Sequence, residues 1–224
     1  MKRLKPMFSY YGAKFRLSPK YPSPIESTII EPFAGSACYS LLHYHQDVKL
    51  YDKYEKICVL WEYLINVSET EIRSLPLLER GEEIPLNLPD GARYLIGFWS
   101  NKAGVRPRLT MTNYKNLEVG FWSASIRERI ASQVSHIRHW TIEQACYSEI
   151  PNIQAHYFVD PPYQDKGQYY AHNKIDFNHL GEWCKTRKGS VVVCENEGAD
   201  WLPFEPFQTT KGLKKQSKEV IYHN

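Results

Sequence analysis

Short apolar runs alternate with longer segments of helical periodicity along this chain. Each run has the length of a buried strand, and the last is expected to lie antiparallel at the edge of a sheet. Strands are predicted at 27–31, 48–51, 157–159, 190–194 and 218–222. Helices are predicted at 37–46, 54–67, 93–101 and 176–187, with two more that begin at Ser-x-x-Glu capping patterns at Ser68 and Ser125. Alternating strands and helices favour an α/β fold.

The first predicted strand leads into a glycine turn and then a helix. Glu31, Pro32, Phe33, Gly35 and Ser36 form this junction. Such a unit opens a Rossmann-like sheet, in which the turn brings backbone close to a ligand and the acid meets a polar group. A purely structural turn is the alternative interpretation of one glycine in a loop.

Asp52 ends the second predicted strand. A carboxylate about 20 residues beyond the glycine turn binds ribose hydroxyls in Rossmann-type folds, so Asp52 is the candidate ribose ligand. It could equally cap the helix predicted at 54–67, and the two roles are compatible.

Asp160, Pro161, Pro162 and Tyr163 follow the apolar run 157–159. The prolines end strand pairing and stiffen the backbone. An acid, a bare carbonyl and an aromatic ring are therefore presented at the carboxyl end of a strand, where open α/β sheets bind ligands. Asp160 and the Pro161 carbonyl could accept hydrogen bonds from both N–H groups of one exocyclic amine, while Tyr163 lies flat on the heterocycle that carries the amine. The alternative is a proline-rich turn with a buried capping aspartate.

Near the N-terminus, Tyr10, Gly12 and Lys14 lie within five residues. A glycine between aromatics and a lysine predicts a tight turn that lets backbone approach a ligand, with the lysine amine at its opening.

From Pro76 to His139 the composition changes, because glycine, proline and asparagine interrupt it and strand-like runs vanish. This favours one catalytic domain formed by 1–75 and 140–224, with 76–139 inserted as a mainly helical target-recognition region.

Within the insertion, the loop 101–115 contains basic and amide side chains without a single acid. Arginine and asparagine suit base edges, and lysine suits phosphates. The candidate DNA contacts are Lys102, Arg106, Arg108, Asn113 and Lys115. A solvated basic loop is the alternative.

Composition narrows the class of protein. A net charge of +3 permits a nucleic-acid partner without requiring one, and 16 tyrosines suit stacking on bases. The five cysteines form no close pair, which favours reduced thiols in a cytoplasmic protein and speaks against a zinc site. The absence of a long apolar run predicts no membrane span.

The tetrapeptide 160–163 resembles the catalytic motif of the amino-methyltransferases. The glycine turn resembles the cofactor motif of the same proteins, and Tyr10, Gly12 and Lys14 fit the N-terminal motif of the Dam-like adenine methyltransferases. The order of all these segments is similar to that of the α group of DNA adenine-N6 methyltransferases across nearly the whole chain. Ala13 and Ala37 depart from it, since each stands where the family usually has glycine.

This resemblance implies a seven-stranded methyltransferase sheet, S-adenosylmethionine as cofactor, and double-stranded DNA as substrate, as in restriction-modification systems of bacteria or phages. It assigns the cofactor to the N-terminal motif, the glycine turn, Asp52 and Asp160, and catalysis on a flipped adenine to 160–163. No metal is implied. RNA or a protein amide as acceptor, and an inactive DNA-binding relic, remain alternatives.

Overall fold

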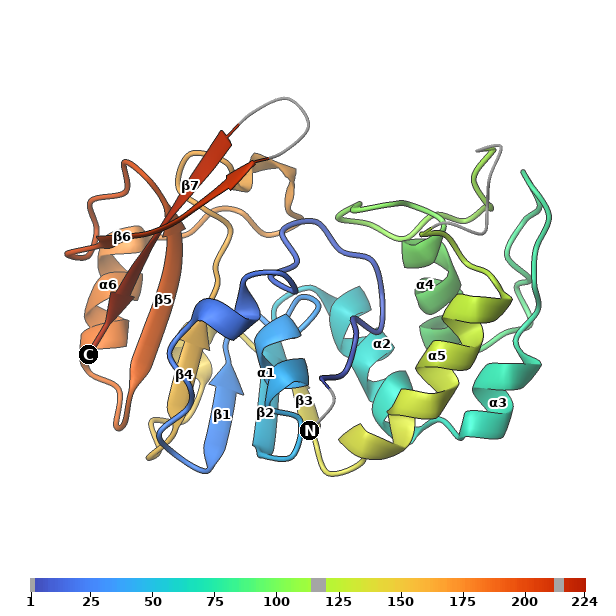
Figure 1. Cartoon of the computed structure of the whole chain (residues 1–224), viewed down its shortest axis with the longest axis horizontal. Coiled ribbons are helices and arrows are strands. Elements are labelled where there is room, and N and C mark those ends of the chain that lie inside the picture. The colour runs from blue at the N-terminus through green and yellow to red at the C-terminus, as the bar shows by residue number, and fades with distance from the viewer. Residues whose placement is uncertain (1–2, 114–119, 212–215) are drawn as a thin grey trace.

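The centre of the molecule is a seven-stranded sheet with the order β3-β2-β1-β4-β5-β7-β6 (Figure 1). The structure is a computed structural model that describes residues 3–113, 120–211 and 216–224. Neighbouring strands from β3 to β5 pair in parallel, whereas β7 runs antiparallel to β5 and to β6. The strands are β1 Thr28–Glu31, β2 Asp47–Asp52, β3 Thr141–Gln144, β4 His156–Val159, β5 Val191–Asn196, β6 Glu205–Lys211 and β7 Gln216–His223.

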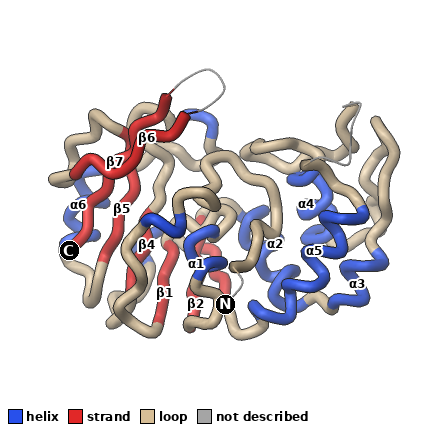
Figure 2. Tube along the Cα trace, in the orientation of Figure 1, coloured by secondary structure: helices blue, strands red, loops and turns tan. Residues whose placement is uncertain are grey.

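Helices flank this sheet, and a group of helices lies beyond one end of it (Figures 1 and 2). In the described ranges the α-helices are α1 Cys38–Leu42, α2 Glu55–Asn66, α3 Glu69–Ser74, α4 Asp90–Trp99, α5 Ala124–Val134 and α6 Phe177–Lys185. Short 3-10 helices lie at Ser18–Lys20, Ser135–Ile137, Tyr147–Glu149 and Gly167–Tyr169. The chain is thus a mixed α/β protein, as its sequence predicts.

Both faces of the central strands are buried, which explains why their sequences are apolar runs without alternation. Ile29 and Phe158 join a cluster with α1 and α2, while Ile30 and Tyr157 join a second cluster with α6. Successive residues of a strand point to opposite faces, so one strand supplies both clusters.

The helices of 76–139 continue the first cluster. Helix α4 packs on α2 and α5 packs on α3, at one end of the molecule (Figure 1). The indole of Trp122 donates to the carbonyl of Pro76 at 2.8 Å and joins the start of the segment to its later part. A division of the chain into two domains stays a prediction.

The predicted end of α1, the predicted cap of α5 and the predicted edge position of β7 are wrong in detail. Helix α1 ends at Leu42 and not at 46, because the carbonyls of Tyr44 and Gln46 accept hydrogen bonds from Trp140 and His139. Ser125 lies inside α5, whose N-cap is Ser123.

Strand β7 is antiparallel as predicted, but β6 lies outside it and forms the edge. The edge strand contains Pro206 and is largely polar, and β3 is largely exposed, so neither produces an apolar run in the sequence. In contrast, Ser68 caps α3 as predicted by accepting from the backbone N–H of Glu71.

All five cysteines are free thiols, and four of them are buried. None of the helices in the described part of the chain has the length and apolar character needed to cross a membrane.

Candidate functional site

Strand order reverses between β1 and β4. From β1 the chain proceeds outward through β2 and β3, and from β4 it proceeds in the opposite direction to β5. The carboxyl ends of two parallel neighbours at such a switch point leave a crevice in which open α/β sheets bind ligands. Glu31 ends β1 and Asp160 directly follows β4, so both acids reach this crevice.

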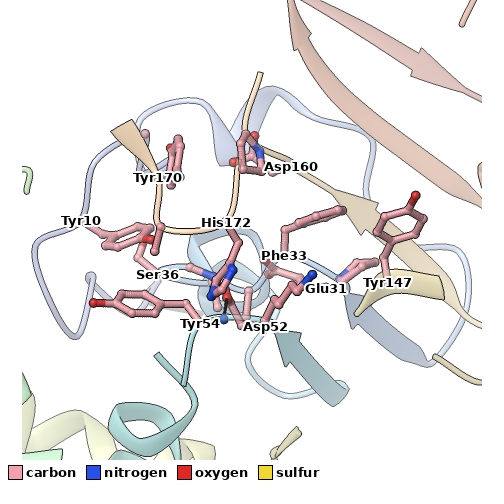
Figure 3. Close-up of a pocket in the computed structure, with 18 of the residues that line it drawn as sticks. Tyr10, Glu31, Phe33, Ser36, Asp52, Tyr54, Tyr147, Asp160, Tyr170 and His172 are labelled. Atoms are coloured by element: carbon pink, nitrogen blue, oxygen red, sulfur yellow. Dashed lines mark hydrogen bonds between the residues drawn. The ribbon is translucent and has the colours of Figure 1, made fainter. Parts of the chain in front are cut away.

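A pocket of about 950 Å³, which includes open solvent at its mouth, occupies the crevice. Figure 3 shows Asp160 and Asp52 on opposite sides of it, with Tyr10, Tyr54 and Tyr170 toward one end. Every residue predicted to bind the cofactor lines this pocket: Tyr10, Gly12, Lys14, Glu31, Pro32, Phe33, Gly35, Ser36, Asp52 and Asp160. Of the remaining catalytic candidates, Pro162 lines it, while Pro161 and Tyr163 do not.

The glycine turn is a strained, well-anchored loop. Gly35 has φ 43°, and a Cβ there would come within 3.2 Å of the Tyr10 ring. Ala37 also lies in the left-handed region, with φ 43° and ψ 42°, which costs a non-glycine residue roughly 1–2 kcal/mol. The indole of Trp61 donates to the Gly35 carbonyl at 2.8 Å. The loop is therefore held in a conformation that its own residues do not favour, as is common at functional sites.

Asp52 joins this turn to the second strand. Its Oδ2 accepts from the backbone N–H of Gly35 at 3.0 Å, and its Oδ1 accepts from that of Tyr54 at 2.8 Å. Burial raises the pKa of Asp52 to about 6, against the lowering effect of these N–H groups. Helix α2 has Tyr54 as its N-cap residue, so the capping role considered for Asp52 is wrong, and its carboxylate instead anchors both loops.

Glu31 is almost fully buried beneath the pocket. One carboxylate oxygen, Oε1, accepts from both the backbone N–H and the hydroxyl of Ser40, at 2.9 and 2.6 Å. Burial raises the pKa of Glu31 to about 8, although the hydrogen bonds from Ser40 lower it. The acid thereby fixes the first turn of α1 against the end of β1.

The N-terminal motif closes the pocket from another direction. Gly12 has φ 75°, and a Cβ at this position would come within 2.3 Å of the Tyr170 hydroxyl. That hydroxyl donates to the carbonyl of Tyr11 at 3.2 Å. The backbone conformation therefore favours glycine at position 12, and its small size lets Tyr170 approach closely.

Lys14 connects this motif to the catalytic candidate. Its Nζ lies 2.8 Å from Asp160 Oδ1, and its side chain is only 10% exposed. Burial lowers the pKa of Lys14, but the carboxylates of Asp160 and Glu219 outweigh that effect and raise it. For Asp160, burial raises the pKa of the carboxyl group, while the positive charge of Lys14 lowers it.

Tyr163 lies behind the pocket wall. Its hydroxyl donates to Glu219 Oε1 at 3.0 Å, and the Lys14 ammonium lies 4.7 Å from the centre of its ring. The same Oε1 atom of Glu219 also accepts a hydrogen bond from the hydroxyl of Tyr21. Glu219 and Tyr21 were missed by sequence reasoning, because a single acid in a predicted strand and a tyrosine in a loop carry no pattern.

The DNA-contact candidates lie elsewhere. Lys102, Arg106, Arg108 and Asn113 are exposed, and Lys115 lies outside the described residues. The loop that contains them is tied to the N-terminal motif, since Tyr11 N–H donates to the Gly104 carbonyl at 3.2 Å. Burial raises the pKa of Tyr54, a pocket residue, and the positive charge of Arg106 acts against it. Arg106 is thus the candidate whose charge reaches the pocket.

No group of His, Cys, Asp and Glu side chains suited to a metal ion occurs among the residues that the structure describes.

Comparison with known proteins adds little. No family model matches the chain, and no curated protein matches it. One similar solved structure is a conserved hypothetical protein of Streptococcus pyogenes, with 11% sequence identity and a TM-score of 0.39 over 92% of this chain and 89% of that one. A likeness of this size supports no functional argument, so membership of the Dam-like family stays a prediction.

Proposed function

We propose that this protein is an S-adenosylmethionine-dependent methyltransferase that methylates the N6 amine of adenine in double-stranded DNA. The observation that carries the proposal is the convergence of separate sequence motifs on one pocket. The glycine turn after β1, Asp52 at the end of β2, the Gly12–Lys14 segment and Asp160 after β4 all line it. Segments far apart in the chain that share both a family resemblance and a crevice support one common ligand.

The lining residues fit the chemistry of this cofactor. Asp52 could accept hydrogen bonds from ribose hydroxyls, and the rings of Phe33 and Tyr10 offer apolar contact to an adenine. When bound, S-adenosylmethionine would supply an electrophilic methyl group on its sulfonium.

The chain's own residues would bind and orient the acceptor. In the proposed reaction the target adenine leaves the base stack, at a cost of a few kcal/mol, and presents its N6 amine to Asp160. Asp160 and the Pro161 carbonyl accept hydrogen bonds from the two N–H groups of the amine, which aims the nitrogen lone pair at the methyl group. Both prolines are buried, so the elbow that presents these acceptors is rigid.

The basic side chains of the segment 101–113 favour DNA as the polymer. Lys102, Arg106 and Arg108 are exposed on a loop whose backbone is bonded to the N-terminal motif. A duplex bound by this loop would therefore lie beside the pocket mouth.

Two measurements test the proposal. Calorimetry with S-adenosylmethionine should show binding to the purified protein, and an inactive relic should show none. Transfer of tritiated methyl groups should then be compared on unmethylated DNA, on RNA and on protein. Label in the DNA, recovered as N6-methyladenine, is the expected result. Label found only in RNA or protein would overturn the choice of substrate.

A further inference from the structure

A buried carboxylate on β7 lies directly behind the proposed catalytic elbow. The side chain of Glu219 is 9% exposed, and the Lys14 ammonium lies 3.8 Å from its Oε1. The same oxygen accepts from the hydroxyls of Tyr163 and Tyr21. Glu219 therefore contacts two members of the proposed site without lining the pocket itself.

The charges of this cluster do not balance. Lys14 supplies one positive charge between two carboxylates, 2.8 Å from Asp160 and 3.8 Å from Glu219. Tyr21, Tyr163 and Cys194 also face the cluster. Burial raises the pKa of each of them above its ordinary value, which keeps them neutral. One ammonium thus has two anionic partners, and it lies closer to Asp160.

The pair between Lys14 and Asp160 conflicts with the proposed role of Asp160. An adenine amine needs an acceptor oxygen, and the ammonium already holds Oδ1 of Asp160, which leaves at most Oδ2 unless Lys14 moves. A charged donor competes well against a neutral amine for the same carboxylate, because charge-assisted hydrogen bonds are about twice as strong. A second anion beside Lys14 would let the ammonium leave Asp160 and would free Oδ1 for the substrate.

We propose that Glu219 is a positioning residue that takes over the Lys14 ammonium when Asp160 accepts the N6 amine of the target adenine. The inference rests on the proposed function. Lys14 moves about an ångström toward Glu219, and its charge stays paired throughout. Glu219 also holds the Tyr163 hydroxyl, so one carboxylate fixes both the ammonium and the aromatic ring behind the elbow. No bond is made or broken in this exchange.

The test is a double-mutant cycle at saturating S-adenosylmethionine on DNA free of N6-methyladenine. Glu219→Gln keeps an oxygen for Tyr163 and Tyr21 but removes the charge. It should lower kcat by about 10–100-fold, which lies within the range of interaction energies between contacting residues of one charged network. Cofactor affinity should change less than about threefold, because Glu219 does not line the pocket. Glu219→Asp should retain more activity than Glu219→Gln.

The second half of the double-mutant cycle uses a variant that lacks the Lys14 ammonium. In a Lys14→Met background there is no charge to take over, so adding Glu219→Gln should lower kcat by less than about threefold, a strong coupling between the two sites. Glu26→Gln is the matched control. Glu26 is an acid whose carboxylate accepts from Ser190 before β5, at the opposite edge of the sheet, and its loss should leave kcat unchanged.

The outcomes separate the two proposals. Additive losses in the cycle, or a Glu219→Gln enzyme that outperforms Glu219→Asp, would refute the exchange of Lys14 while leaving methylation intact. Absence of methyl transfer by the wild-type protein to any acceptor would refute the function, and the inference with it. Thermal unfolding of each variant shows whether a lost rate reflects a lost fold.

Discussion

The charged residues of the sheet edge and of the segment 76–139 are used in opposite ways. At the carboxyl edge of the sheet, Glu31, Asp52 and Asp160 are buried or half-buried, and each already has a partner from the protein. In the segment 76–139, Lys102 and Arg108 extend into solvent. Acids that are paired with the protein's own groups form a preorganised pocket, whereas exposed basic side chains remain available to a second molecule.

The segment 76–139 also shows that basic charge alone does not mark an interface. The sequence places Arg127, Arg129 and Arg138 on the surface of a helix, where they could contact phosphates. In the structure their guanidinium groups donate to the carbonyls of Leu75, Pro6, and both Ile65 and Val67. These arginines join α5 and the residues after it to the rest of the molecule, which leaves the loop 101–113 as the better candidate for DNA.

The strongest test of the acidic edge is Asp160→Ala. Turnover should fall at least about 100-fold, as it does when one preorganised group is removed from an active site, because the acceptor acts mainly in the transition state. Affinity for S-adenosylmethionine should fall far less than turnover, because Asp160 is only one of several residues proposed to bind the cofactor. Methyl transfer under saturating conditions measures the effect, with the exposed acid Asp200 changed to alanine as control. A near-normal rate in Asp160→Ala would refute the proposal that Asp160 orients the adenine amine.

The second test uses pH and concerns Glu31. Its pKa rises from an ordinary 4.5 to about 8 on folding, so its stabilising contribution is complete below about pH 4.5 and disappears as the pH rises through about 8. Between pH 5 and pH 8 the free energy of unfolding should therefore fall by roughly 2–4 kcal/mol on account of this group.

Urea unfolding of the wild type and of Glu31→Gln at both pH values measures that contribution. The variant should show the smaller decrease, since its amide does not titrate. Equal decreases in the two proteins would mean that Glu31 stays charged in its buried position.

Asp52→Ala addresses the cofactor end of the pocket. Loss of a charge-assisted hydrogen bond costs about 1.5–3 kcal/mol, so the dissociation constant for S-adenosylmethionine should rise tenfold or more. Affinity for DNA without cofactor should not change. Because Asp52 also holds Gly35 and Tyr54, thermal unfolding must show that the variant folds. Wild-type cofactor affinity in a folded Asp52→Ala protein would leave the residue as an anchor of the loops only.

The basic loop is tested by alanine substitution at three positions. One of Arg106 and Arg108 should read a base, and its removal should cost about 1–3 kcal/mol at a single base pair. Lys102→Ala should weaken binding equally on all sequences and reduce the salt slope by about one unit. Methylation of a library of randomised sites separates the two patterns.

Arg138→Met is the control for these substitutions. It removes hydrogen bonds to two carbonyls and should lower stability while leaving the salt slope unchanged. Identical preference profiles for the three alanine variants and the wild type would mean that the loop only clamps phosphates and that another element reads sequence.

The smallest effect is expected from Ala37→Gly in the turn after β1. Glycine relieves the left-handed strain of roughly 1–2 kcal/mol but loses a buried methyl and gains freedom in the unfolded chain, so stability should rise by less than about 1 kcal/mol. Chemical denaturation is sensitive enough to detect this. A clear loss of stability would show that packing of the Ala37 methyl outweighs the strain.

The sequence by itself determined much of the frame. Apolar runs such as 157–159 and 190–194 identified strands that are buried on both faces, since burial leaves no other residue types there. The motifs around Glu31, Asp52 and Asp160 follow strand ends, and parallel strands bring their carboxyl ends to one edge. The acids and the glycine turn that line the pocket could therefore be predicted from the sequence, whereas Tyr54, Tyr147 and Tyr170, which also line it, carry no such pattern.

Only the tertiary structure decided how those residues are paired. The hydrogen bond that holds Tyr163 and the burial of Glu219 depend on β7 lying beside β5, 23 residues or more from its partner in the chain. The ion pair between Lys14 and Asp160 depends on the N-terminal segment lying against the end of β4. The hydrogen bonds from Arg138 to carbonyls at the end of α2 also depend on the tertiary structure. The reason is that a local pattern encodes which face of an element is buried, while the partner of a charge depends on contacts between segments far apart in sequence.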